Sequence, residues 1–90
     1  MKKNVPWKGW SSQKPSRKQR NKMYDKCGDK CFLGKKKSFV ICKKNTCDIS
    51  NKGIYSAYIR ARQYSSHGTK YKIIASKAKH MLTRKKLKII

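Results

Sequence analysis

The chain has 90 residues, of which 26 are Lys or Arg and only 3 are Asp or Glu, so the formal net charge at pH 7 is +23. A chain of this length forms at most one small domain, which needs reinforcement to be stable. It contains no run of 18 apolar residues that would span a membrane. It also contains no glycine-rich phosphate loop and too few carboxylates for paired acid–base chemistry, so we expect a protein that is not an enzyme.

Residues 1–22 contain eight Lys or Arg and no acid, together with both prolines and both tryptophans of the chain. Their apolar residues follow neither a helical nor a strand period, and Pro6 and Pro15 disfavour regular structure. We therefore predict an extended basic arm that is disordered in isolation. Trp7 and Trp10 either anchor the arm on a partner surface, or one of them folds back onto the core.

Residues 23–49 contain all four cysteines and all three acids. Two short runs rich in β-formers, at 32–33 and 39–41, are separated by the five residues Gly-Lys-Lys-Lys-Ser. This pattern predicts a β-hairpin with a basic turn. The opening residues, MKKNVPWKGW, lack the apolar stretch of a signal peptide, so the cellular compartment does not decide whether the cysteines are oxidised.

The cysteines are spaced C-x3-C-x10-C-x4-C. Two close pairs joined by a hairpin can offer four thiolates to one tetrahedral zinc ion, although ordinary zinc ribbons use C-x2-C. Two disulfides are an equally weighted alternative, and the sequence does not choose among the three possible pairings. In either case the role is structural. The residues concerned are Cys27, Cys31, Cys42 and Cys47.

Two helices are expected in residues 50–90. The first is capped by Ser50 or Asn51 and runs to about Tyr64, and the second follows a loop at 65–68 and is capped by Thr69. The apolar positions are Ile54, Ala57, Tyr58, Ala61 and Tyr64 in the first helix and Ile73, Ile74, Ala78, Met81 and Leu82 in the second. The predicted fold is thus small α+β, with an extended basic arm (1–22) before one domain (23–90) in which a cysteine-stapled β-hairpin (23–49) precedes a helical pair (50–90).

The cations of residues 1–22 and 50–90 have no acid within their own segments. Lysine strongly outnumbers arginine, which suits neutralisation of phosphates better than bidentate contacts to bases. We therefore expect sequence-independent, strongly salt-dependent binding to double-stranded DNA. The residues expected to bind nucleic acid are Lys35, Lys36, Lys37, Arg60, Arg62, Lys70, Lys72, Lys77, Lys79, Arg84, Lys85 and Lys86.

Two further uses of these cations carry less weight. The last 20 residues have the composition of a basic amphipathic helix on an anionic membrane, but their apolar face is needed for the core. Lys35–Lys37 and Arg84–Lys86 also fit short nuclear localisation signals, a pattern with many false positives.

The stretch 23–64 resembles a group of small lysine-rich virion proteins of large double-stranded DNA viruses. The matching elements are KCGDKCFLG, SFVIC, KNTC and GIYSAYIRARQY, with a weaker match at KYKIIASKAKHML. The resemblance implies a virion component, either associated with the packaged genome or lodged under the capsid shell. During assembly such a protein resides in the host cytoplasm or nucleus.

Two hypotheses follow. In the first, the chain is a virion structural protein that binds DNA without reading its sequence. In the second, it is a minor capsid cement protein whose arm threads between capsid subunits without binding DNA. The expected partners are double-stranded DNA or viral capsid proteins, with no small-molecule substrate and no cofactor other than the zinc ion left open above.

Overall fold

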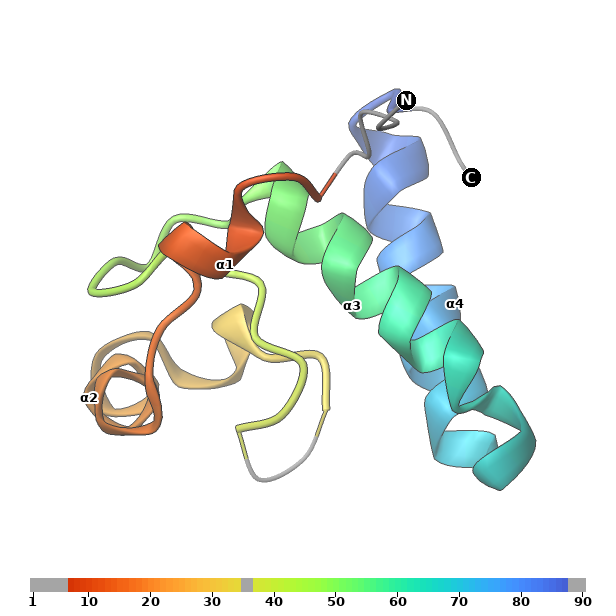
Figure 1. Cartoon of the computed structure of the whole chain (residues 1–90), viewed down its shortest axis with the longest axis horizontal. Coiled ribbons are helices and arrows are strands. Elements are labelled where there is room, and N and C mark those ends of the chain that lie inside the picture. Colours follow the sequence, from red (N-terminus) through yellow and green to blue (C-terminus); the bar gives the residue numbers. More distant parts are fainter. Residues whose placement is uncertain (1–6, 35–36, 88–90) are drawn as a thin grey trace.

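The computed structural model describes residues 7–34 and 37–87. Its largest unit is a pair of helices, α3 (Asn51–Gln63) and α4 (Thr69–Arg84), that pack against each other and are joined by the short 3-10 helix η2 (Ser65–His67) (Figure 1). Ser50 caps α3, because its hydroxyl accepts a hydrogen bond from the Gly53 N–H at 3.4 Å. The predicted helical pair and the predicted cap of its first helix are confirmed. The predicted cap of the second helix is wrong, because Thr69 is the first residue of α4 and Gly68 stands at the cap without a side-chain bond.

The apolar periodicity of both helices is largely confirmed by burial. The buried residues of the pair include Ile54, Ala57, Tyr58, Ala61, Ile74, Ala78 and Leu82. Two predicted core residues are wrong: Tyr64 is 46% exposed and Ile73 is 52% exposed. Tyr64 stands at the end of α3, and Ile73 lies about 100° around α4 from Ile74, so only one of those two neighbours faces α3.

The N-terminal segment contains two helices joined by short connections, so the predicted extended arm is wrong for residues 7–22. Helix α1 (Trp10–Gln13) is followed by α2 (Arg17–Cys27), which crosses the boundary drawn at residue 22, and by the 3-10 helix η1 (Gly28–Cys31). The overlooked signal is a capping box, in which Ser16 accepts from the Gln19 N–H and the Gln19 side chain accepts from the Ser16 N–H. Pro15 stands just before this cap, where it interrupts no helix.

The predicted β-hairpin is also wrong. Residues 7–34 and 37–87 contain no strand, only the isolated antiparallel bridges Phe32–Val40 and Cys42–Ile49. The chain does fold back, since the Leu33 N–H donates to the Phe39 carbonyl at 3.1 Å. However, Phe39 has a φ of 55° and Lys37 a φ of 61°. Because both residues are in the left-handed region, the segment around 37–39 is not extended and the ladder does not propagate.

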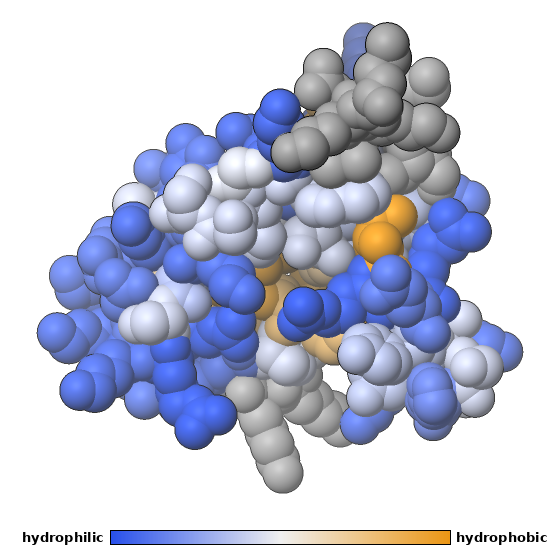
Figure 2. Space-filling view, in the orientation of Figure 1, coloured by the Kyte–Doolittle hydropathy of each residue, from blue (hydrophilic) through white to orange (hydrophobic). Residues whose placement is uncertain are grey.

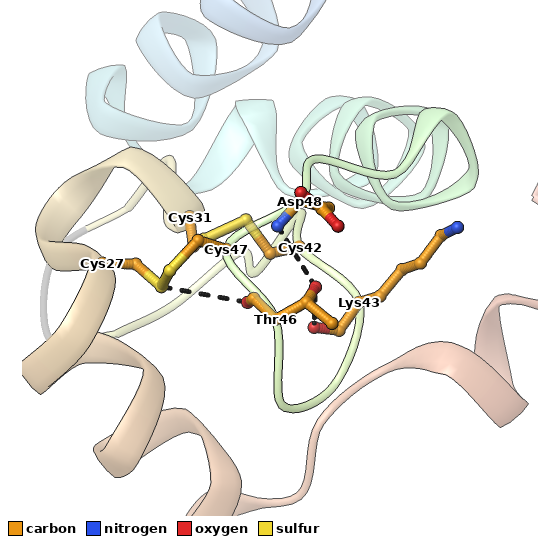
Figure 3. Close-up of a disulfide and its surroundings, with 7 residues drawn as sticks. All are labelled: Cys27, Cys31, Cys42, Lys43, Thr46, Cys47 and Asp48. Carbon is orange, nitrogen blue, oxygen red and sulfur yellow. Dashed lines mark hydrogen bonds between the residues drawn. A yellow bond between two sulfur atoms is a disulfide. The ribbon is translucent and has the colours of Figure 1, made fainter.

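Two disulfides fasten this irregular segment. Cys27 pairs with Cys47 and Cys31 with Cys42, with Cα–Cα distances of 5.6 and 5.1 Å (Figure 3). One core cluster of buried residues lies between the helices and includes Ile41, Ile54 and Leu82. The inner pair is fully buried in a second core cluster that also contains Trp10, Met23, Phe32 and Val40. Of the two alternatives left open by the spacing, the structure therefore has disulfides.

The disulfide-bonded part of the chain before residue 50 and the pair of helices α3 and α4 meet at Gly53. A Cβ atom at this position would lie 2.7 Å from the Ile41 carbonyl oxygen and 2.8 Å from Cη2 of Trp10, so only glycine permits this approach. Ser50 adds polar links beside it, since its N–H donates to the Ile41 carbonyl at 2.7 Å and its hydroxyl donates to Gln13 Oε1 at 3.1 Å. Helix α3 is thus fixed against the disulfide-bonded half.

Candidate nucleic-acid interface

Helix α4 presents its cations to solvent because its apolar residues occupy the opposite side. Ile74, Ala78 and Leu82 are four residues apart and face α3, each at most 6% exposed. All five cations within the helix are exposed, and the helix contains no acid. These five side chains, Lys70, Lys72, Lys77, Lys79 and Arg84, are called the α4 cations below.

The α4 cations form two rows. Lys70, Lys77 and Arg84 follow one another at intervals of seven residues, and Lys72 and Lys79 do the same on the other side. With about 100° of rotation and 1.5 Å of rise per residue, members of a row are about 10.5 Å apart along the axis. The two rows are about 160° apart around the solvent side, so they point in nearly opposite directions.

The strip between the two rows carries no Lys or Arg. It consists of five exposed residues: Thr69, Ile73, Ser76, His80 and Thr83. An α-helix with its side chains is about 10–12 Å across, close to the roughly 12 Å width of the DNA major groove. The arrangement therefore has the dimensions needed for contacts to phosphates on both sides of a groove.

The C-terminal end of α4 extends this positive surface. Lys85 and Lys86 follow Arg84 and are exposed, and the left-handed φ of 58° at Lys86 ends the helix there. The Leu87 N–H then donates to the Leu82 carbonyl at 2.9 Å, which satisfies one of the last helical acceptors. Cations at this end also interact favourably with the helix dipole.

Aromatic rings gather at the turn between α3 and α4. Tyr64 lies 5.7 Å from Tyr71 and 5.9 Å from His67, measured between ring centroids, and Phe39 lies 6.1 Å from Tyr71. The Lys70 ammonium lies 5.1 Å from the centre of the Tyr71 ring, so the first cation of one row is positioned by this cluster. Tyr58, by contrast, is only 7% exposed and packs in the core, as its spacing predicts.

The remaining predicted nucleic-acid residues do not join the α4 cations. The Arg62 guanidinium lies 5.5 Å from the centre of the Tyr58 ring on α3. The charge of Arg60 helps to lower the pKa of Arg20 on α2, which shows that the two side chains lie near each other. Lys37 donates to Asn21 Oδ1 at 2.9 Å, on the α2 side of the molecule. Lys35 and Lys36 lie outside the described residues.

The two tryptophans are placed against the protein itself. Trp10 is 6% exposed, and Trp7 is partly buried and packs against both core clusters. Of the two alternatives for these side chains, the structure therefore favours folding back, and Trp10 has little surface left for a partner. The buried Trp10 side chain also holds α1 against the core, which is why residues 10–13 do not form part of an extended arm.

The cysteines are not arranged as metal ligands. All four are paired in disulfides, so none is available as a thiolate. Within residues 7–34 and 37–87, no group of three or more His, Cys, Asp or Glu side chains is placed to hold a metal ion. A zinc site formed by Cys27, Cys31, Cys42 and Cys47 is therefore not supported.

Three cations near the start of α2 were missed by the sequence analysis. Lys14, Arg17 and Arg20 lie together on the side of the molecule formed by α2, with Lys37 nearby. Their proximity depends on α2 being a helix, which the capping box at Ser16 would have revealed.

The chain was compared with protein-family models, with curated proteins and with solved structures, and none of the three comparisons gives a match. The described part of the chain also contains no helix that is both long and apolar enough to cross a membrane.

Proposed function

We propose that this protein is a non-enzymatic virion structural protein that binds duplex DNA without reading its sequence, through the α4 cations. The observation that carries the DNA-binding part is the pair of cation rows on either side of a strip without Lys or Arg. Contacts on both sides of a groove neutralise phosphates of both strands. The strip lacks Arg, Asn and Gln, whose bidentate contacts discriminate between bases, so sequence preference is weak.

The charge balance supports the same proposal. Three carboxylates cannot neutralise 26 cations, and all three lie at residues 25–48, outside α3 and α4. A compact chain with this excess repels itself, and phosphates relieve that repulsion. Release of condensed counterions from the DNA supplies the binding free energy.

The assignment to a virion rests on the resemblance of residues 23–64 to small virion proteins of large double-stranded DNA viruses. The alternative role as capsid cement relied on an extended arm with tryptophan anchors. Because residues 10–13 and 17–27 are helical and Trp10 is buried, that role loses its structural basis over this segment. We therefore propose a position in the virion next to the genome.

The test is fluorescence anisotropy with two labelled duplexes of unrelated sequence, measured at several salt concentrations. Five phosphate contacts give a slope of log K against log salt of about −4.5, which is a loss of roughly 500-fold between 50 and 200 mM. The variant Lys70→Gln/Lys77→Gln/Arg84→Gln removes one row and is expected to make the slope shallower by about 2.7. The control Lys26→Gln/Lys30→Gln/Lys43→Gln removes three exposed cations outside α4.

The row variant is expected to weaken binding to both duplexes equally and far more than the control does. If both variants weaken binding to the same extent, the α4 cations are not the interface. If the unmodified protein binds duplex DNA weakly or with little dependence on salt, DNA binding itself is wrong, and an acidic protein surface becomes the better partner.

A further inference from the structure

A second cationic site lies on the other side of the molecule from α4, where α2 begins. It is a pocket of about 650 Å³ between the α1–α2 connection, the first turns of α2 and residues 37–38. Four cations line it: Lys14, Arg17, Arg20 and Lys37. In Figure 2, hydrophilic side chains cover the α2 side of the molecule, and Figure 1 places α3 between α2 and α4.

The four cations are brought together without a neutralising acid, because no Asp or Glu lines the pocket. Lys37 is held by neutral groups: its ammonium donates to Asn21 Oδ1 at 2.9 Å and lies 5.4 Å from the centre of the Tyr24 ring. Fixing a lysine between a carboxamide and a ring orients its charge but does not cancel it. The pocket therefore keeps a concentrated positive potential.

Arg20 shows the cost of this arrangement. Its Nε atom is buried and has no hydrogen-bond partner among the described residues. A buried donor that remains unpaired is unfavourable. Burial lowers the pKa of the Arg20 guanidinium, and the nearby charges of Arg60 and Arg17 lower it further. An anion in the pocket would offset this repulsion between the cations.

Phosphate is the anion that best fits these side chains. Guanidinium groups match the geometry of phosphate oxygens and bind them in a bidentate manner, while lysine adds a point charge. The volume is within the range of pockets for small ligands and leaves room for more than one phosphate. We propose that this pocket binds a phosphate group, belonging either to a polynucleotide backbone or to a polyphosphate.

This site is independent of the proposed function, since it shares no residue with the α4 cations. The test is isothermal titration of the full-length, disulfide-bonded protein with sodium tripolyphosphate in a low-salt chloride buffer. The variant Arg17→Gln/Arg20→Gln removes two lining cations, and the control Lys18→Gln/Lys30→Gln removes two exposed cations that do not line the pocket. We expect affinity to fall about tenfold or more in the first variant and about twofold or less in the control.

Lys37→Gln is a second test that leaves α2 and Arg20 unchanged, and it is expected to reduce affinity several-fold if circular dichroism shows an unaltered fold. Competition by a short duplex then identifies the source of the phosphate. If duplex displaces tripolyphosphate and Arg17→Gln/Arg20→Gln weakens both ligands, the pocket binds the DNA backbone. If the variant weakens tripolyphosphate alone, the ligand is a polyphosphate. Equal losses in variant and control, or no binding of tripolyphosphate, would overturn the proposal.

Discussion

Removing the disulfides one at a time tests how this small fold is held together. The Cys31–Cys42 loop, with a sequence separation of 11, lies inside the Cys27–Cys47 loop, with a separation of 20. Taken alone, loop closure in the unfolded chain is worth about 2.8 kcal/mol for the inner loop and about 3.3 kcal/mol for the outer one. While the inner bridge is intact, however, the outer one closes a ring of only about ten residues, and its value drops to about 2.7 kcal/mol.

Because the loops are nested, the single and double removals are not additive. Cys27→Ser/Cys47→Ser should cost about 2.7 kcal/mol, and removal of the inner bridge about 2.1 kcal/mol from loop closure. The inner pair is also fully buried, so Cys31→Ala/Cys42→Ala loses packing worth roughly 1–2 kcal/mol more. Loss of both bridges then approaches the total stability expected for 90 residues, about 5–13 kcal/mol.

The measurement is urea unfolding followed by far-UV circular dichroism, which reports the helices. The inner-pair variant is expected to have the lower urea midpoint, and the variant lacking all four cysteines is expected to be largely unfolded. Intact mass checks the premise, since two disulfides make the chain about 4 Da lighter than its reduced form. An unchanged mass after reduction, or wild-type midpoints in both pair variants, would refute the reasoning.

Three other perturbations follow from the packing and the charge. Gly53→Ala should lower the free energy of unfolding by about 1–3 kcal/mol, because its Cβ would overlap Ile41 and Trp10. The control Gly68→Ala, whose nearest neighbour would be 4.0 Å away, should change the free energy of unfolding by no more than about 0.5 kcal/mol. Equal urea midpoints for the two variants would contradict this. Ser16→Ala should cost about 1 kcal/mol and speed amide exchange in the first turn of α2, and unaltered exchange would rule out the capping box. Heparin should raise the melting temperature while uncharged dextran should not, because only a polyanion relieves the repulsion of a +23 chain; equal effects would count against this.

The helical pair was predictable from the sequence because its signals are local. Residues 54, 57, 58 and 61 repeat with the period of a helix, and Ser50 stands where a cap is needed. The identity of the α4 cations also followed, since a buried apolar face leaves the lysines outside. The spacing of seven residues also implies their division into two rows, but we did not predict this division from the sequence.

The N-terminal half was not predictable in the same way. Apolar residues are too few around 17–27 to give a helical period, and only the short Ser16–Gln19 signal marks the start of α2. The β-formers at 39–41 suggested a strand, but Phe39 takes a left-handed φ in the fold. The disulfide pairing and the approach of Lys37 to the pocket beside Arg20 join residues far apart in the sequence, so no local pattern specifies them.

The central claim is that the α4 cations contact DNA, and lysine footprinting tests it most directly. The disulfide-bonded protein is acetylated with and without a saturating duplex, and each lysine is quantified by mass spectrometry. Lys70, Lys72, Lys77 and Lys79 are expected to be strongly protected by DNA, whereas Lys26, Lys30 and Lys43, which are also exposed, should react as before. Equal protection of both sets, or protection of the second set alone, would contradict the account.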